Sequence, residues 1–351
     1  MPDKKIIENI SNYYPIKISQ SFDNDIRSIE SLELIAKSLN DIFRFFEPSL
    51  YEGELVVFNN FLDNEVIKDA PTLLYDKNIL INMQVDVICI QIMSDGRLLY
   101  WQNIDYKTYL DNSDTLFYSF HNNREFFYAN SNKIEITCYP KGSRFATQFI
   151  KLEEVLSNYA VEKIKYSSCP IFETAWFDDN RIFFKGGGKN IPENIMQSSL
   201  SNYLKDNIRG IETEILREYT LGATKPVDIR VHWKEANRAV LIELKWLGKS
   251  KKDDGSIASA HYNGRVNEGM VQLKEYMDLE NQDTPTCITK GILVVIDGRR
   301  YNSGVDTLTI NSHDGRYYLN SELIIDDDKQ YYVSNKHFES PIRMFAEPIC
   351  I

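Results

Sequence analysis

Three residues in the second half of the chain have side chains suited to metal-dependent hydrolysis: Asp228, Glu243 and Lys245. Glu243 and Lys245 lie two positions apart in the apolar run AVLIELKWL, and residues two apart in a strand point to the same face. If the strand that contains Asp228 pairs with this run across the polar turn 234–238, both carboxylates and the ammonium group meet on one face. Two carboxylates form the oxygen site that Mg²⁺ prefers, and the backbone carbonyl of Leu244 is a further candidate ligand. Such a metal lowers the pKa of a bound water, which a neighbouring lysine can orient or deprotonate.

A glutamate and a lysine two apart in a strand more often form an ordinary ion pair on a solvated face. Two further features favour a catalytic site over that alternative. Asp228 lies 15 positions before Glu243, at a distance that a strand, a turn and a second strand would span. The helix predicted over residues 266–279 carries Gln272 and Tyr276, which are four positions apart and therefore lie on one helix face.

This combination resembles the PD-(D/E)XK nuclease superfamily, in the branch whose core is followed by a Q-x-x-x-Y helix. The matching segments are Pro226-Val227-Asp228, Glu243-Leu244-Lys245 and Gln272-Leu-Lys-Glu-Tyr276. The family's core also begins with a helix that carries a metal-associated acid, and Glu193, followed by Gln197, is similar to it. Three other acids compete for that place: Glu212, Glu214 and Glu218. The resemblance covers residues 190–300 and none of the N-terminal half.

The resemblance implies Mg²⁺-dependent hydrolysis of phosphodiester bonds, with Mn²⁺ able to substitute for Mg²⁺. Asp228, Glu243 and Glu193 would then be the metal-binding acids. Lys245 would orient the attacking water, and Gln272 would hold Lys245 or a backbone phosphate. Relatives with this core and an extra domain often serve in DNA restriction or antiphage defence, so DNA is the expected substrate and a 5′-phosphate end the expected product. This expectation is an analogy with the family.

The net charge of −11 alone argues against a nucleic-acid partner, but the charge is unevenly distributed. Residues 181–265 contain 15 Lys/Arg and 10 Asp/Glu, which gives this segment +5 and leaves −16 for the rest of the chain. Acids beside the lysines, at positions 253 and 254, also fit a mixed, solvated loop. The candidates for contacts with nucleic acid are three lysines and one tyrosine: Lys249, Lys251, Lys252 and Tyr276.

The elements that must position these residues can be predicted from their periodicity. The segments predicted in the second half are helix 192–208, strands 213–221, 227–233 and 239–247, helix 266–279, buried strand 291–297, and strands in the tail at 317–325 and 330–335. The order predicts a restriction-endonuclease-like α/β core, a mixed sheet flanked by helices. A lysine- and glycine-rich connection is expected over residues 248–264.

The N-terminal half predicts a separate α+β domain of unknown type. Its predicted segments are helix 24–46, strands 54–58, 79–93, 97–101 and 132–140, and helix 147–160. A hairpin over residues 175–185 is followed by three glycines, 186–188, which lack the Gly-Lys-Ser/Thr ending of a phosphate loop and favour a linker. We therefore expect domains at 1–168 and 169–351, the second with a strand-rich C-terminal extension.

The remaining features place the chain in a reducing cytoplasm. Its five cysteines are scattered without a CxxC pair, which argues against a zinc site and a disulfide framework. No apolar stretch approaches the roughly 18 residues of a membrane helix, and the N-terminus lacks the pattern of a signal peptide.

Two alternatives to a constitutive nuclease stay open. One is a nuclease-fold protein that binds nucleic acid or a partner without cutting. The other is a sensor in which the N-terminal domain binds a ligand or partner protein and gates the nuclease. No helicase or ATPase motif is present, so any motor would be a separate ATPase chain, and a homodimer is compatible with the sequence.

Overall fold

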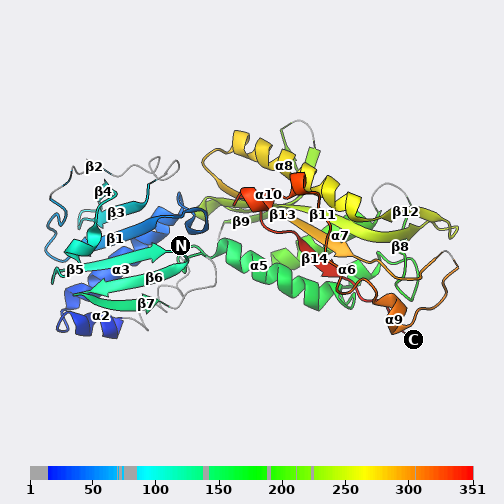
Figure 1. Ribbon diagram of the computed structural model, residues 1–351, viewed down its shortest axis with the longest axis horizontal. Coiled ribbons are helices and arrows are strands. Elements are labelled where there is room, and N and C mark those ends of the chain that lie inside the picture. The colour runs from blue at the N-terminus through cyan, green and yellow to red at the C-terminus, as the bar shows by residue number, and fades with distance from the viewer. Residues whose placement is uncertain are drawn as a thin grey trace. The chain divides into compact units, whose positions relative to one another are not determined.

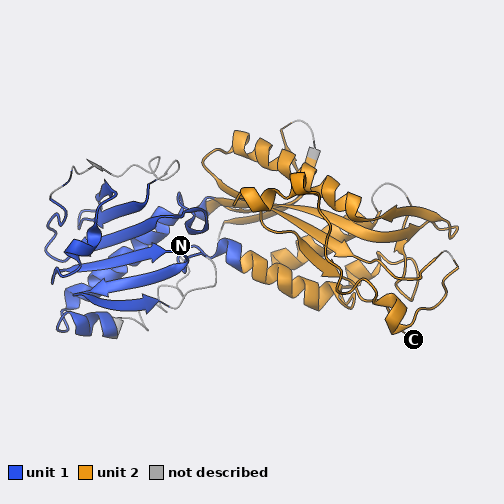
Figure 2. Cartoon of the chain, viewed as in Figure 1, with its two compact units in different colours: residues 1–150, 235–237 blue, residues 151–234, 238–351 orange. Residues whose placement is uncertain are grey.

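The computed structural model describes residues 15–68, 70, 73–74, 85–136, 142–187, 191–210, 212–222, 225–304 and 306–350. The chain divides into two compact units, residues 1–150 with 235–237, and residues 151–234 with 238–351 (Figure 2). The division precedes the boundary predicted after residue 168. The reason lies in helix α5 (Gln148–Tyr159), which packs with the second unit: the hydroxyl of Tyr159 donates to Ser199 Oγ over 2.8 Å.

The first unit is a seven-stranded sheet covered by helices α2 (Pro15–Ser21) and α3 (Ile26–Phe43). The strand order is β2-β4-β3-β1-β5-β6-β7, and all pairings are antiparallel except that of β1 with β3 (Figure 1). The strands are β1 (Glu54–Asn60), β2 (Leu73–Leu74), β3 (Val87–Ile92), β4 (Leu98–Gln102), β5 (Thr115–His121), β6 (Arg124–Ala129) and β7 (Asn132–Ile136).

Both faces of this sheet are apolar. On one face α3 contributes Leu32, Ile35 and Leu39 to a buried cluster, and on the other Trp101 lies in a separate cluster with Phe58. The predicted helices 24–46 and 147–160 and strands 54–58 and 97–101 are confirmed. The predicted strands 79–93 and 132–140 are confirmed over β3 and β7, while residues 79–84 and 137–140 lie outside the described residues.

The second unit is a mixed sheet between helices. Its main path is β14-β13-β11-β10-β9, and β8 and β12 also pair with β11. β10 pairs antiparallel with both β9 and β11, whereas β13 pairs in parallel with both β11 and β14. Its elements are α6 (Pro170–Glu173), β8 (Phe184–Lys185), α7 (Ile191–Asn207), β9 (Thr213–Leu221), β10 (Lys225–Trp233), β11 (Arg238–Lys251), β12 (Ile257–His261), α8 (Asn263–Asp283), β13 (Ile288–Asp297), α9 (Ser312–Gly315), α10 (Tyr331–Ser334) and β14 (Ile342–Phe345). The predicted α/β class and mixed sheet flanked by helices are confirmed.

Helix α8 packs closely on β11 and β13 and forms one outer layer of this unit (Figure 1). Its buried residues Met270 and Leu273 share an apolar cluster with Leu241 and Leu293 of the two strands. Gly269 permits the close approach, because a Cβ atom there would lie 2.8 Å from both Lys245 Cγ and Leu293 Cδ1. The helix therefore lies directly over the predicted catalytic lysine.

The predicted strands of the tail are wrong. Residues 317–325 form turns and irregular chain, and residues 331–334 form the short helix α10. Leu323, Ile325 and Tyr331 instead pack, partly buried, against the apolar cluster of α8. In the described part of the tail, β14 is the only strand of the sheet and Phe338 adds an isolated bridge to Gly291, so the extension is not strand-rich.

Two further predictions need correction. The connection expected over residues 248–264 is largely strand, because β11 continues to Lys251 and turns back into β12. The glycine run is not a linker between the units: Gly186 lies inside the second unit, and its N–H donates to the carbonyl of Lys251 over 2.5 Å. A Cβ atom on Gly186 would lie 2.4 Å from that of Ala258, so glycine is needed there for packing. The hairpin predicted before it is present as a single antiparallel bridge between Trp176 and Phe184.

Four cysteines, Cys89, Cys169, Cys287 and Cys350, are free thiols, and Cys138 lies outside the described residues. Among the described helices, none combines the length and apolar character that crossing a membrane requires.

Candidate metal centre

Asp228 lies where the ladder between β10 and β11 opens. The paired residues run from Trp233 with Arg238 to Ile229 with Ile242, and the ladder stops one residue short of Asp228. There the Asp228 carboxylate replaces a backbone acceptor, because its Oδ2 accepts a hydrogen bond from the N–H of Leu244 over 2.7 Å. The other oxygen, Oδ1, accepts from Nε2 of Gln197 over 2.6 Å. Both oxygens of this carboxylate are therefore fixed in place.

Three carboxylates from three elements meet at this opening. Glu193 comes from the first turn of α7, Asp228 from β10 and Glu243 from β11, and one oxygen of each lies within 4.8 Å of the others. All three side chains are buried. The competing acids on β9 lie elsewhere: Glu214 pairs with Lys234, and Glu218 is exposed. The structure thus places Glu193, and neither of these rivals, beside Asp228 and Glu243.

Lys245 occupies the centre of this acidic cluster and is only 2% exposed. Its Nζ donates to Glu243 Oε1 and, over 3.2 Å, to Glu193 Oε1. Arg265, near the start of α8, donates to the second oxygen of Glu193 over 3.1 Å and also pairs with the exposed Glu268. Three carboxylates therefore face two cations, one of which is shared with an acid outside the cluster.

The pKa values of the cluster reflect burial and mutual repulsion. Burial, reinforced by Asp228, raises the pKa of Glu243 to about 8, despite the opposing effect of Lys245. Burial also raises the pKa of Asp228 to about 6, while Lys245 and the Leu244 N–H oppose the shift. Burial alone would lower the pKa of Lys245, but the charges of Glu243 and Glu193 outweigh it and raise that pKa. Lys245 is therefore cationic at neutral pH, and Glu243 keeps its proton to a higher pH than an ordinary carboxyl group does.

A divalent cation fits this set of donors. Glu243 Oε2 is buried and has no hydrogen-bond partner among the described residues. An unsatisfied buried carboxylate oxygen is costly, and a cation would relieve both that cost and the repulsion among the acids. The donors are all hard oxygens, which favours Mg²⁺ or Mn²⁺ over softer metals. Asp228, Glu243 and Glu193 would hold such a cation, and the Leu244 carbonyl stays a predicted ligand.

The predicted contact between Gln272 and Lys245 is absent from the described structure, and the alternative contact of Gln272 with a backbone phosphate stays a prediction. Lys245 Nζ is turned toward Glu193 and Glu243, and no hydrogen bond joins it to Gln272 in the described structure. Gln272 Oε1 is buried, again without a partner among the described residues. Tyr276 is 4% exposed in the apolar cluster, so it is not available to stack on a nucleic-acid base. Burial and the charges of Glu243 and Asp228 raise its pKa.

The three lysines after the site have separate surroundings. Lys249 lines a cavity and donates to the carbonyl of Ser303 over 3.0 Å. Lys251 is buried, with its Nζ 4.0 Å from the ring centre of Phe183, and this position removes it from direct contact with a macromolecule. Lys252 is exposed at the turn between β11 and β12.

Periodicity could not have identified Arg265, because it lies 20 positions after Lys245 and meets Glu193 only through the packing of α8. Gln197 was part of the predicted helix pattern, but its bond to Asp228 has no signal in the sequence. The arginines at 299 and 300 follow a buried strand without a recognisable motif, and the structure places both in the cavity with Lys249.

No protein-family model matches this chain, and neither a curated protein nor a solved structure is significantly similar to it.

Proposed function

We propose that the protein is a metal-dependent phosphodiesterase, an endonuclease of the PD-(D/E)XK type that acts on DNA. The observation that carries this proposal is the convergence of Glu193, Asp228 and Glu243 on Lys245. An ordinary buried ion pair needs one carboxylate for one lysine. Three carboxylates with one orphaned oxygen are destabilising by themselves, and that arrangement is what binding a divalent cation would require.

The residues have distinct roles in this proposal. The bound metal would polarise a phosphoryl group and lower the pKa of a water molecule. Lys245 is positively charged and would offset the negative charge that develops on the phosphoryl oxygens, while orienting the attacking water. Gln197 and the Leu244 N–H hold the Asp228 carboxylate in one orientation, and Arg265 does the same for Glu193. A site held in this way loses little energy to reorganisation during the reaction.

We further propose that this nuclease is the effector of a restriction or antiphage defence system. DNA as substrate derives from the resemblance of the core motif and from the basic segment 181–265, defence as setting from the resemblance alone, and the cytoplasm as location from the scattered cysteines. The first unit has its own sheet and apolar clusters and no part in the acidic cluster. We assign to it the sensing of a ligand or partner protein that gates cleavage. A separate ATPase chain or a second copy of this chain could be that partner protein.

The test is cleavage of plasmid, linear duplex and single-stranded DNA and of RNA, each with Mg²⁺, Mn²⁺ or EDTA. We expect cleavage of DNA that requires the metal and is lost in Lys245→Ala and Asp228→Asn. Lys274→Ala is the matched control, because it removes a lysine that is paired with Asp278 on the exposed side of α8. Equal cleavage by wild type and Lys245→Ala would refute the assigned mechanism.

A further inference from the structure

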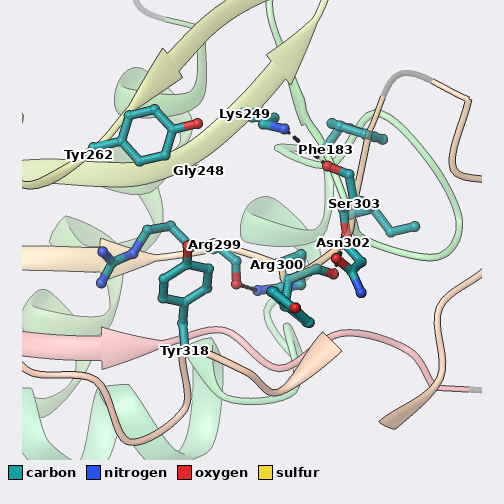
Figure 3. A pocket seen from close by; sticks show the side chains of 12 residues that line it. Phe183, Gly248, Lys249, Tyr262, Arg299, Arg300, Asn302, Ser303 and Tyr318 are labelled. Carbon is teal, nitrogen blue, oxygen red and sulfur yellow. Dashed lines mark hydrogen bonds between the residues drawn. The ribbon is translucent and has the colours of Figure 1, made fainter. Parts of the chain in front are cut away.

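A cavity of about 250 Å³ lies in the second unit, where β11 and β13 end (Figure 3). It is smaller than the roughly 300–1,000 Å³ of pockets that enclose drug-sized ligands, so it suits one nucleotide unit and not a duplex. Three of the residues that line it, Lys249, Arg299 and Arg300, are cationic and none is acidic, so the lining favours an anion.

The three cations are not neutralised to the same extent. Arg299 pairs with Asp297, with Nη2 to Oδ2 at 2.7 Å, but Arg343 shares that same carboxylate oxygen at 2.7 Å. Lys249 Nζ has a carbonyl, that of Ser303, as its acceptor. One carboxylate therefore serves two arginines, and positive charge remains in excess around the cavity.

Arg300 is the most unusual of them. It is 8% exposed, and its guanidinium donates to two backbone carbonyls, those of Arg299 and Arg181. Its Nε is buried without a hydrogen-bond partner among the described residues, and no carboxylate of those residues pairs with it. Burial lowers the pKa of this guanidinium to about 10, so it still carries its charge at neutral pH. Such a buried cation is stabilised when an anion enters beside it.

Aromatic rings lie beside these cations. Tyr262 is 53% exposed at the cavity and has room for a base to stack on it. The guanidinium of Arg299 lies 4.6 Å from the ring centre of Tyr318, which fixes that arginine from a second side. Figure 3 shows Tyr262 and Tyr318 on the two sides of Arg299. Cations with an accessible aromatic ring match a phosphate joined to a nucleoside better than a bare anion.

The cavity is connected to the acidic cluster through two elements. Lys249 lies four residues after Lys245 on β11, which corresponds to about 13 Å of extended strand. Tyr262 caps α8, and Arg265, three residues later, contacts Glu193. At about 3.4 Å per nucleotide step along a B-form strand, this separation corresponds to a few nucleotides.

We propose that this cavity binds a phosphate of the nucleic-acid strand that is cut at the acidic cluster, with Lys249 and Arg300 as anion contacts and Tyr262 as the stacking surface. The inference rests on the proposed nuclease function. The phosphate can be the terminal phosphate of a strand or an internal one, and the chemistry of recognition is the same.

The test measures binding without metal, so its result does not depend on cleavage. Full-length protein in EDTA is titrated into 3′-labelled single strands of about 12 nucleotides, with a 5′-phosphate or a 5′-hydroxyl, and fluorescence anisotropy is read at several salt concentrations. We expect Lys249→Ala to weaken binding about tenfold and to reduce the slope of log K against log salt by about 0.7. Tyr262→Ala should weaken binding without changing the slope, and Lys274→Ala should change neither quantity.

The two 5′ ends identify the source of the phosphate. A preference for the 5′-phosphate strand that disappears in Lys249→Ala supports a terminal phosphate, whereas an equal loss on both strands supports an internal one. Wild-type affinity and salt slope in both Lys249→Ala and Tyr262→Ala would overturn the inference. Arg300→Met is informative if its melting temperature matches the wild type, and Lys249→Ala decides the question otherwise. Metal-dependent cleavage, measured separately, tests the nuclease itself.

Discussion

Raising the pH should strengthen metal binding at the acidic cluster. Glu243 and Asp228 must lose their protons to bind a divalent cation, and burial raises their pKa values to about 8 and about 6. Because both pKa values lie above the ordinary carboxyl range, protons compete with the metal at pH values where free carboxylates would already be ionised. The affinity should therefore rise with pH through neutrality, where an ordinary carboxylate site would be insensitive.

The size of the effect follows from these two pKa values. For each acid, competition by protons weakens the metal affinity by the ratio of the total acid to its deprotonated form. The product of the two ratios is about 200 at pH 6, about 12 at pH 7 and about 2 at pH 8. The dissociation constant should fall about 17-fold from pH 6 to pH 7, about sixfold from pH 7 to pH 8 and less than twofold from pH 8 to pH 9. Near pH 7, each metal ion bound should release about one proton, which comes from Glu243.

Isothermal titration calorimetry with Mg²⁺ and no nucleic acid measures both quantities. Repeating the titration in buffers of different ionisation enthalpy gives the number of protons released. Glu243→Gln is the control, because it removes a ligand and the titrating group together and should abolish the release. A dissociation constant that stays the same from pH 6 to pH 8, with no proton released, would refute the reasoning about the cluster.

Other variants separate catalysis from stability. Lys245→Ala should lower the cleavage rate by about 10²–10⁴-fold in a single-turnover assay while calorimetry still detects metal binding; an unchanged rate would contradict its role. Gly269→Ala should lower the melting temperature and the cleavage rate together, since its methyl group would press on Lys245 and Leu293 at a cost of about 1–3 kcal/mol, and a neutral effect would show that α8 can move away. Breaking the buried pair of Arg230 and Glu280 by Glu280→Gln should cost about 3–5 kcal/mol in denaturant unfolding but leave metal affinity unchanged, because the pair lies outside the cluster. Without metal, the carboxyl groups of Glu243 and Asp228 stabilise the fold below about pH 4, and this contribution is lost as the pH rises to about 8, because both pKa values are raised in the folded protein. Saturating Mg²⁺ should therefore raise the melting temperature more at pH 8 than at pH 6.

The sequence predicted elements best where one periodicity dominated. Strand β9 matches its predicted range, which lies between Gly210 and Gly222. Strand β11 extends four residues beyond its predicted end, since the polar residues Lys249, Ser250 and Lys251 are held in the strand by pairing with β12, which local sequence does not reveal. The strands predicted in the tail are wrong because a local strand preference is overridden by packing. Its aromatic residues favour strands, but they pack as side chains on the α8 cluster and find no sheet edge to join.

The site was predictable only as far as strand geometry reaches. The period of two brought Glu243 and Lys245 together, and a turn of suitable length returned Asp228 to the same place. Glu193 depended on a resemblance, because its helix is separated from β11 by two strands. Arg265 and the arginines of the cavity are brought in by tertiary packing alone. Side chains that act through elements distant in the chain leave no periodic signal.

Asp228 serves the backbone as well as the proposed chemistry. Its carboxylate takes the N–H that a neighbouring strand would otherwise have bound, so the two strands part there without leaving a buried donor unpaired. The same residue thus sets where β10 and β11 separate, and any change in this opening would move one of the proposed metal ligands. Asp228→Ala would leave the Leu244 N–H without its acceptor, whereas Asp228→Asn can keep that acceptor while it removes the charge and the acceptor that faces Gln197. The asparagine variant therefore separates the hydrogen bond to the backbone from the charge that is proposed to bind a cation.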